Sequence, residues 1–403
     1  MALANSVLSR FERRTTSGRF IPVVEGLRFV SIMFVVLFHI NGYLSVKSPL
    51  RDAGPIDVGF VQRLAMIGHY GVQLFFVISG FVLALPFAAH QLLKAPAVRL
   101  RAYFLRRVTR LEPPYVLSML GLFLMHILID GANSPSSLSH LGASLAYLHN
   151  QIYATNSTIN TVAWSLEVEV QFYLLAPLLA SVFLISSPTK RRATLVAGML
   201  LAVALQTLAN PIAGGRLSLS IVNYIQFFLL GFLLADYFLV DWKGTPAVSN
   251  YWDVVAVVGW PALAIVLMRD WATRLTLPAL VFVLFCAGLR GKRTSALLSD
   301  RWVTTIGGMC YSIYLLHYPI ISAIARHTVT IGSARAYPVH LLVQSVLLVS
   351  SSVLISALYF MLIERPCMDK DWPRRLVSAV SRRVLRNADA GQPSVTATLE
   401  GAA

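Results

Sequence analysis

Two ionisable side chains stand inside a long apolar run near the start of the chain. The run VVEGLRFVSIMFVVLFHI, residues 23–40, contains Arg28 and, eleven residues later, His39. Eleven residues make about three helical turns, so both side chains would share one helix face, roughly 16 Å apart. A guanidinium binds anionic oxygens, and an imidazole takes and returns protons near neutral pH. The pair therefore predicts a functional site on the face that looks into the protein.

Each of the two residues also has a structural explanation. Arg28 lies close to the expected helix start and could extend to the membrane interface, and His39 could be an interhelical hydrogen bonder. A charge at the bilayer centre costs about 2.5–3.5 kcal/mol on insertion scales, so such residues need a reason. A histidine and an arginine on one protein-facing stripe are better explained by a site.

A second group of charges is the arginine cluster in YFLRRVTRLEPPY, residues 103–115. Arg106, Arg107 and Arg110 lie at the expected entrance of an apolar helix at residues 111–129. Guanidinium forks bind phosphate oxygens in a bidentate manner, so the cluster is a candidate phosphate site. The alternative is a positively charged cytoplasmic anchor, with Pro113 and Pro114 marking the helix start.

Two carboxylates open the apolar run after Trp164 in TVAWSLEVEVQFYLLAPLL. Glu167 and Glu169 would be about 200° apart on a helix, so they cannot both face one site. We expect one of them to serve the site and the other to be explained by the helix N-terminus or a loop.

A second histidine, His317, lies in IGGMCYSIYLLHYPII, residues 306–321, together with Tyr311 and Tyr314. Counted from the inner end of its expected helix, His317 lies about as deep as His39. The two histidines are therefore predicted to flank one cavity.

The elements that must position these residues are membrane helices. The chain has 403 residues, of which 56% are hydrophobic and only 13% charged, which is typical of a multi-pass membrane protein. A spanning helix needs roughly 20 apolar residues. We predict an all-α transmembrane bundle with ten spans, at residues 21–44, 67–89, 111–129, 165–186, 193–212, 221–240, 253–268, 271–289, 303–325 and 338–363.

Positive charge sets the expected orientation of the bundle. With a cytoplasmic N-terminus, the inner segments hold 25 of the 34 lysines and arginines, so both termini are predicted to be cytoplasmic. The net charge of +16 is accounted for mostly by these membrane-proximal positions, and no nucleic-acid partner is expected. Membrane lipid is the expected contact. We divide the chain into an N-terminal cytoplasmic segment (1–20), a membrane domain (21–366) and a basic, partly disordered C-terminal segment (367–403).

The three cysteines, Cys286, Cys310 and Cys367, fall in spans or on the inner side, where thiols stay reduced. No disulfide framework and no metal-ligand set is predicted. The first twenty residues lack a short apolar core followed by a small-residue cleavage site, so no signal peptide is expected.

Six motifs, in order, resemble the membrane-bound acyltransferase family three, the ten-span bacterial O-acyltransferases that modify envelope polysaccharides and related acceptors. The match runs from about residue 25 to residue 366. The motifs are EGLRF followed by FHI, GVQLFFVISGFVLAL, FLRRVTRLEPPY, WSLEVEVQFYLL, GGMCYSIYLLHYP and IERP.

The resemblance implies transfer of an acyl group, most simply acetyl, from cytoplasmic acyl-CoA to a hydroxyl of a sugar or glycolipid acceptor in or across the bacterial inner membrane. Acyl-CoA is then a substrate, and no resident cofactor is expected. His39 would act as general base, or alternatively as a transient acyl carrier, and Glu169 would orient or balance His39 or Arg28. Tyr311 or His317 would donate to the developing oxyanion. Donor phosphates would be bound by Arg28, Arg106, Arg107 and Arg110, with Trp164 as a further substrate-binding residue.

Several positions depart from the family pattern. Many relatives have aspartate at Glu25, an acidic residue at Gln73 and at Val170, and a small residue at Glu167, so Glu169 is the family glutamate. The extracytoplasmic domain of some relatives is not seen in this sequence, so we expect transfer to be completed by the membrane part or a partner. A proton-coupled transporter stays the alternative, although no repeated half is visible. A noncatalytic membrane scaffold would need none of these buried charges.

Overall fold

The computed structural model describes residues 20–51, 59–131, 137–268, 273–333 and 336–369, together with parts of the segment 371–381. Within these ranges every regular element is a helix, and one isolated backbone bridge joins Ser249 and Gly291. The all-α prediction is therefore confirmed for this part of the chain. The basic residues 1–19 and the predicted disordered tail lie outside the described residues.

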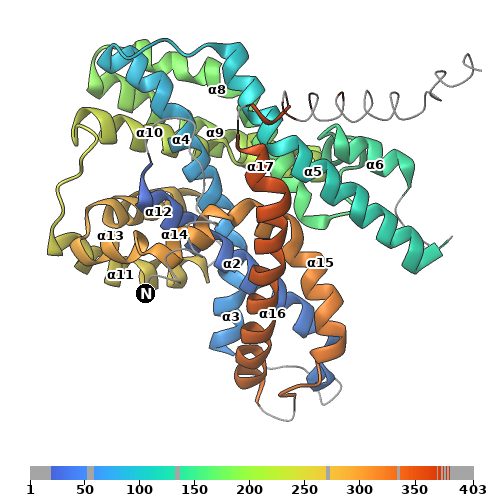
Figure 1. Ribbon diagram of the computed structural model, residues 1–403. Helices are drawn as coiled ribbons and strands as arrows, with labels where there is room; N and C mark the ends of the chain where they lie inside the picture. Colours follow the sequence, from blue (N-terminus) through green and yellow to red (C-terminus); the bar gives the residue numbers. More distant parts are fainter. Residues whose placement is uncertain are drawn as a thin grey trace, which may run out of the picture.

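Long apolar helices make up most of the molecule (Figure 1). Seven helical stretches in the described ranges are long and apolar enough to cross a membrane. An eighth crossing forms if α14 and α15, which meet at a bend of 71°, are counted as one broken span. The ten predicted apolar ranges overlap α2 (Pro22–Lys47), α4 (Gly71–Leu93), α5 (Leu100–Asp130), α8 (Trp164–Leu179), α9 (Pro188–Ser218), α10 (Ile225–Val240), α11 (Asn250–Leu267), α12 (Thr273–Arg290), α15 (Cys310–Thr328) and α16 (Tyr337–Tyr359).

Short helices join these spans or lie beside them. They are α3 (Phe60–Met66), α6 (Leu138–Leu145), α7 (His149–Tyr153), α13 (Lys292–Leu298), α14 (Arg301–Gly308) and α17 (Arg365–Cys367). A π-helical segment, Phe360–Glu364, separates α16 from α17.

The prediction that Pro113 and Pro114 mark a helix start is wrong, because α5 begins at Leu100 and runs through both prolines. A proline lacks the N–H that would bond the carbonyl four residues earlier. The carbonyl freed by Pro113 is that of Thr109, and it accepts a hydrogen bond from Trp372 Nε1 at 2.9 Å. An outside donor thus satisfies the carbonyl that Pro113 leaves open, and the helix continues.

The carbonyls just after this point are also used by aromatic side chains from other helices. The hydroxyl of Tyr311 donates to the Leu111 carbonyl at 2.9 Å, and that of Tyr359 donates to the Pro114 carbonyl. The proline region of α5 is therefore a junction that ties α5 to α15 and α16.

Two close helix contacts depend on glycine. A Cβ on Gly80 of α4 would collide with the backbone of Phe228 in α10, so α4 and α10 pack at backbone distance. A Cβ on Gly307 would collide with the backbone carbonyl of Glu25, which seats α14 against the first turn of α2. In Figure 1, α2 crosses the centre of the molecule between α14 and the long pair α15 and α16. The helix that carries His39 therefore packs against α4, α14, α15 and α16.

Candidate active site

The two predicted histidines meet in the structure. His39 of α2 and His317 of α15 have ring centres 5.1 Å apart, with 49° between the ring planes. His39 is half-buried and also packs edge-on against Tyr318, at 5.1 Å between ring centres. His317 is completely buried. We call His39 and His317 the histidine pair.

The hydrogen bonds of His317 fix its tautomer. Its Nδ1 lies 2.9 Å from the carbonyl of Ile313 and 2.8 Å from that of Tyr314. Since carbonyl oxygens only accept, Nδ1 carries the proton and a neutral His317 keeps a lone pair on Nε2. This buried Nε2 has no hydrogen-bond partner among the described residues. A neutral His317 is therefore built to accept a proton at Nε2 and not to donate one there.

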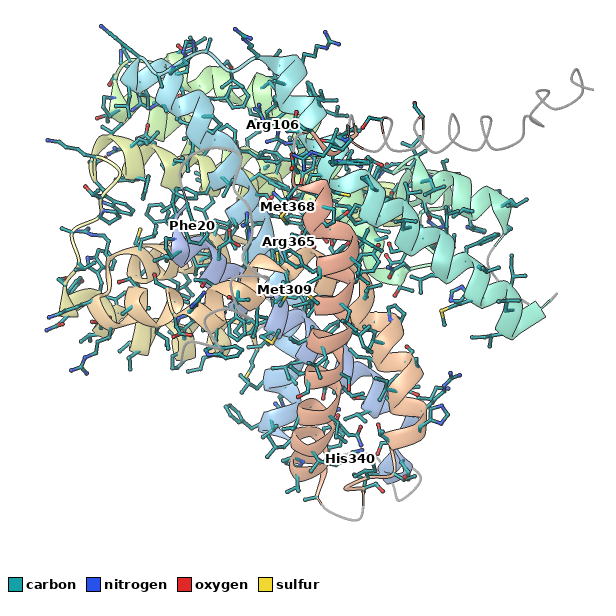
Figure 2. The ribbon with its side chains drawn as sticks, in the orientation of Figure 1. Phe20, Arg106, Met309, His340, Arg365 and Met368 are labelled. Atoms are coloured by element: carbon teal, nitrogen blue, oxygen red, sulfur yellow. The ribbon has the colours of Figure 1, made fainter. Side chains whose placement is uncertain are left out.

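A carboxylate positions the helix that carries His317. The chain bends by 71° between α14 and α15, which leaves the first N–H groups of α15 without helical partners. Glu364 accepts from the Ser312 backbone N–H at 3.1 Å and from the Ser312 hydroxyl at 2.5 Å, and it is fully buried. Figure 2 shows Met309, at this bend, in the middle of the molecule. The sequence predicts no role for Glu364, although it is the glutamate of the IERP motif.

Glu169 lies where four helices converge. Its carboxylate accepts a hydrogen bond from the Ser79 hydroxyl of α4 at 2.5 Å. It also interacts electrostatically with Arg107 of α5, Tyr173 of α8 and Tyr314 of α15. Because the backbone carbonyl of Tyr314 holds His317, Glu169 is linked to the histidine pair through Tyr314.

The three clustered arginines do not share one environment. The Arg107 guanidinium lies 3.5 Å from the ring centre of Tyr103 and 5.4 Å from that of Tyr173, and its Nη1 donates to the Tyr103 carbonyl at 2.8 Å. Arg110 also interacts with Tyr173. Arg106, labelled in the upper part of Figure 2, is exposed. The structure thus places Arg107 and Arg110 beside the Glu169 cluster and Arg106 at the surface.

Arg28 forms an ion pair on its own helix. Its Nη1 lies 2.6 Å from Glu25 Oε1, and the two side chains are 12% and 5% exposed. The positive charge at this end of α2 is therefore balanced before any ligand binds.

Glu167, the second carboxylate of α8, is completely buried. Its Oε2 accepts from the Asn150 backbone N–H at 2.9 Å and so holds the start of α7. The Asn150 side chain in turn donates to the Trp164 carbonyl at 3.0 Å. The expectation that only one of the two glutamates faces the site agrees with this geometry, and Glu167 is explained by the loop.

Two further predicted site residues make contacts that hold the fold together. The Tyr311 hydroxyl donates its hydrogen bond to the Leu111 carbonyl. Trp164 packs against Tyr224, with ring centres 5.4 Å apart.

No group of three or more histidine, cysteine, aspartate or glutamate side chains in the described ranges is arranged to hold a metal ion. All three cysteines are free thiols.

These features define a multi-pass helical membrane protein with two contacting histidines in its interior and two arginines beside the Glu169 cluster. A family model described as an acyltransferase domain, Acyl_transf_3, matches residues 21–361. The chain therefore belongs to the acyltransferase 3 family.

Curated relatives carry a consistent name. The chain is 24% identical over 379 residues to O-acetyltransferase OatA of Staphylococcus aureus strain NCTC 8325 / PS 47, covering 88% of this chain and 58% of the relative. It is 21% identical over 344 residues to the putative O-acetyltransferase SACOL0978 of strain COL, covering 77% of this chain and 52% of that protein. The chain thus spans somewhat more than half the length of these relatives. No solved structure matches.

Proposed function

We propose that this protein is a membrane O-acyltransferase that moves an acyl group, acetyl in the first instance, from cytoplasmic acyl-CoA to a hydroxyl of a sugar or glycolipid. The observation that carries the proposal is the contact between His39 and His317, two rings 5.1 Å apart on helices distant in sequence. Family membership and relatives named O-acetyltransferases support the same conclusion. The proposal places the chain in a bacterial cytoplasmic membrane with ten crossings and both termini inside.

His39 acts as the general base in this proposal. One of its ring nitrogens takes the proton of the acceptor hydroxyl while the hydroxyl oxygen forms a bond to the thioester carbonyl carbon. The tetrahedral intermediate then breaks its carbon–sulfur bond, and the leaving thiolate receives the proton from the His39 imidazolium. The Nε2 lone pair of His317 is suited to stabilise that imidazolium by accepting its other N–H.

The oxyanion of the intermediate needs donors that are not already used. The Tyr311 hydroxyl would have to release the Leu111 carbonyl to donate to it, and His317 would have to be protonated at Nε2. We propose both as donors. Tyr311 would lose its hydrogen bond to Leu111, and His317 would lose the free lone pair on Nε2.

The donor-binding part of the proposal rests on the arginines. Arg107 and Arg110 bind donor phosphates at the inner mouth, and the exposed Arg106 contributes little. Arg28 binds a donor phosphate as well, and the pantetheine arm spans the roughly 16 Å along α2 from Arg28 to His39. Glu169 holds Arg107 in place through its charge. Trp164 is proposed to contact the acceptor, since its indole lies at the start of α8.

Labelled acetyl-CoA tests the proposal in lipid nanodiscs. The purified protein is incubated with acetyl-CoA and an envelope glycolipid extract, and free CoA and labelled product are followed. We expect His39→Ala to lower the transfer rate by about 10²–10⁴-fold while its unfolding temperature stays unchanged.

The matched control is His327→Ala, which removes an exposed histidine of the same α15 that carries His317. It should leave the rate unchanged. Transfer that persists in a folded His39→Ala would remove the general-base role. Failure of the wild type to bind or consume any short acyl-CoA would remove the acyltransferase proposal itself.

A further inference from the structure

A shallow cavity of about 430 Å³ lies apart from the histidine pair, between α7, α8, the end of α9 and the 3₁₀ turn Ile221–Asn223. Its polar lining comes from Gln151, Gln171, Arg216 and Ser220, and its apolar lining from Leu217, Ile221 and Val222. Gln171 follows Glu169 by two residues, which puts it about 200° around α8. The cavity is therefore on the other side of α8 from the Glu169 cluster.

Arg216 is held rigidly at the rim of this cavity. Its Nε donates to the Gln151 carbonyl at 2.9 Å and its Nη2 to the Ile152 carbonyl at 3.3 Å. These carbonyls belong to the last turn of α7, where helical carbonyls lack partners and a cation is favoured. The Nη1 edge of the guanidinium is the part left for a ligand.

Gln171 is fixed in one amide orientation. Its Oε1 accepts a hydrogen bond from the Ile221 backbone N–H at 2.8 Å. The Nε2 group of Gln171 therefore presents N–H donors on the other side of the amide. Together with Arg216 it gives the cavity two anchored donor groups and one positive charge, and no carboxylate lines it. Such a lining recognises anionic oxygens.

Apolar side chains continue the cavity along the outside of the bundle. On α8, Leu174 and Leu178 follow Gln171 by three and seven residues, share its face, and are 64% and 70% exposed. On α9, Leu205 and Leu208 are exposed as well. An anionic head at Arg216 would thus lie near exposed apolar side chains of α8 and α9.

We propose that this cavity binds the phosphate or carboxylate group of a membrane amphiphile whose hydrocarbon chain lies along the exposed leucines of α8 and α9. The inference rests on the proposed function, in which the amphiphile would be the acyl acceptor. An acceptor anchored in this cavity by its lipid end would lie one helix width, about 10 Å, from the Glu169 cluster. Trp164 packs against Tyr224. Tyr224 follows the lining residue Val222 by two positions, which places this aromatic pair near the cavity.

The decisive variant is Gln171→Glu. A glutamate keeps an oxygen for the Ile221 N–H but replaces the amide donors with negative charge. Purified full-length protein in phosphatidylcholine nanodiscs is titrated with dodecyl phosphate, and binding is followed through the rise in unfolding temperature. We expect Gln171→Glu and Arg216→Gln to weaken the apparent affinity by about tenfold or more.

Gln91→Glu, which adds the same charge at an exposed position near the end of α4, should leave dodecyl phosphate binding unchanged. Equal affinity in the wild type, Gln171→Glu and Arg216→Gln would overturn the proposal. Because the measurement is binding and not acyl transfer, its failure is distinct from failure of the proposed function.

Two competitors identify the source of the anionic group. Displacement by a polyprenyl phosphate at lower concentration than by phosphatidylglycerol supports a lipid-linked acceptor. Displacement by both at similar concentrations supports an ordinary phospholipid head. If neither competes, the cavity does not select an anionic amphiphile and the proposal is wrong.

Discussion

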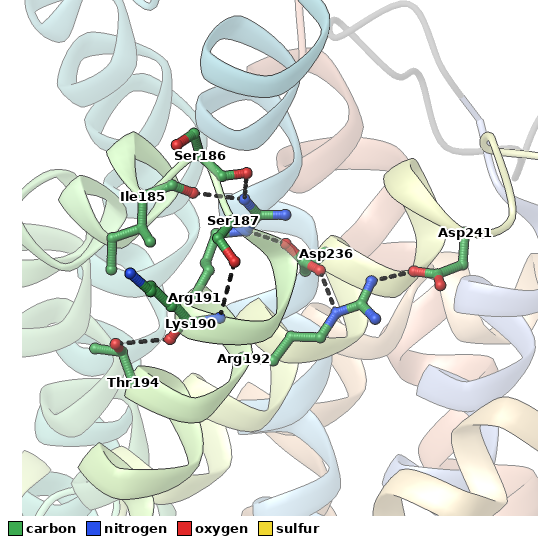
Figure 3. Close-up of polar contacts among 9 residues, drawn as sticks. All are labelled: Ile185, Ser186, Ser187, Lys190, Arg191, Arg192, Thr194, Asp236 and Asp241. Atoms are coloured by element: carbon green, nitrogen blue, oxygen red, sulfur yellow. Dashed lines mark hydrogen bonds and ion pairs between the residues drawn. The ribbon is translucent and has the colours of Figure 1, made fainter.

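Two of the regions in which the bundle buries ionisable groups treat them differently. In the histidine pair, His317 Nε2 is buried without a partner in the described part of the chain. In the arginine–aspartate network of α9 and α10, formed by Arg191, Arg192, Asp236 and Asp241, the buried charges are matched (Figure 3). Both regions are costly to bury, but only one leaves a polar atom unused.

Each oxygen of Asp236 in the arginine–aspartate network is paired with an arginine. Arg191 and Asp236 are 1% and 0% exposed, and the Arg191 Nε pairs with one oxygen of Asp236. The other oxygen of Asp236 accepts from Arg192 Nε at 2.7 Å, and Arg191 Nη1 donates to the Ile185 carbonyl at 2.6 Å. Such a network joins α9 to α10 and has nothing left for a substrate.

An unpaired buried polar atom lowers the stability of the folded state by about 1–3 kcal/mol, so we expect it to be retained where it serves a function. We infer that the histidine pair is kept for chemistry and the arginine–aspartate network for structure. His340 sharpens the comparison. It is also fully buried, its Nδ1 lies 3.2 Å from the Ile331 carbonyl, and its Nε2 also has no partner among the described residues. It lies in the first turn of α16 (Figure 2), whereas His39 and His317 lie within α2 and α15.

The largest effect is expected from His317→Gln. Glutamine can keep a donor near the Ile313 and Tyr314 carbonyls but lacks the imidazole Nε2 that accepts the His39 N–H in the proposed mechanism, so the transfer rate should fall by at least about 10²-fold. The rate of labelled acetyl transfer per folded molecule measures this. His340→Gln is the matched control and should stay within about threefold of wild type. Equal losses in the two variants would show that an unpaired buried histidine does not mark the site.

The next effect is on stability and falls on the arginine–aspartate network. Asp236→Ala leaves two arginines without their buried partner and should lower the free energy of unfolding by about 3–5 kcal/mol. Asp241→Asn, at a carboxylate that is 42% exposed, should cost no more than about 1 kcal/mol. Unfolding in detergent measures both. A folded Asp236→Ala with normal stability but lost transfer would reverse the roles that we assign to the two regions.

Arg107→Ala should act mainly on the donor. Removing a guanidinium that binds phosphate should raise KM for acetyl-CoA by about 10- to 100-fold with a smaller change in kcat. Arg106→Ala, one residue away but exposed, should change KM by less than about threefold. Steady-state kinetics with varied acetyl-CoA separates the two. If Arg106→Ala has the larger effect, the donor binds at the surface and not beside Glu169.

The smallest effect concerns His149, a buried histidine whose ring nitrogens both have partners. Its Nδ1 donates to the Thr155 carbonyl at 3.1 Å, and its Nε2 lies 2.8 Å from Nδ1 of His140. Burial lowers the pKa of His149, so the folded state favours the neutral ring. Stability should therefore fall as pH drops through the unfolded-state value of about 6.5.

Thermal unfolding between pH 7.5 and pH 5.5, both chosen as about one unit from that value, measures this dependence. The fall should be smaller in His149→Gln, while transfer per folded molecule at neutral pH stays as in wild type. A rise in stability on acidification that depends on His149 would contradict the assignment.

Much of the fold follows from the sequence. The ten apolar ranges each overlap a helix, because the length of an apolar run and the absence of charges decide where a helix can lie in a membrane. The sequence does not predict the start of α5, because the carbonyl freed by Pro113 finds its donor, Trp372, only in the folded molecule.

The site was partly predictable as well. The helical period placed Arg28 and His39 on one face and set Glu167 and Glu169 on opposite faces. It did not say which glutamate would face the Arg107 side or that Glu364 would hold the start of α15.

The sequence by itself determined the class of the molecule, its helices, its family and the list of residues able to do chemistry. The tertiary structure alone decided that His39 meets His317, that Arg107 turns inward while Arg106 turns outward, and that Tyr311 is already hydrogen-bonded. Local periodicity fixes which side chains share a face of one helix. Distances between side chains on different helices are set by how those helices pack, and in this bundle glycines such as Gly80 and Gly307 and the break before α15 set that packing.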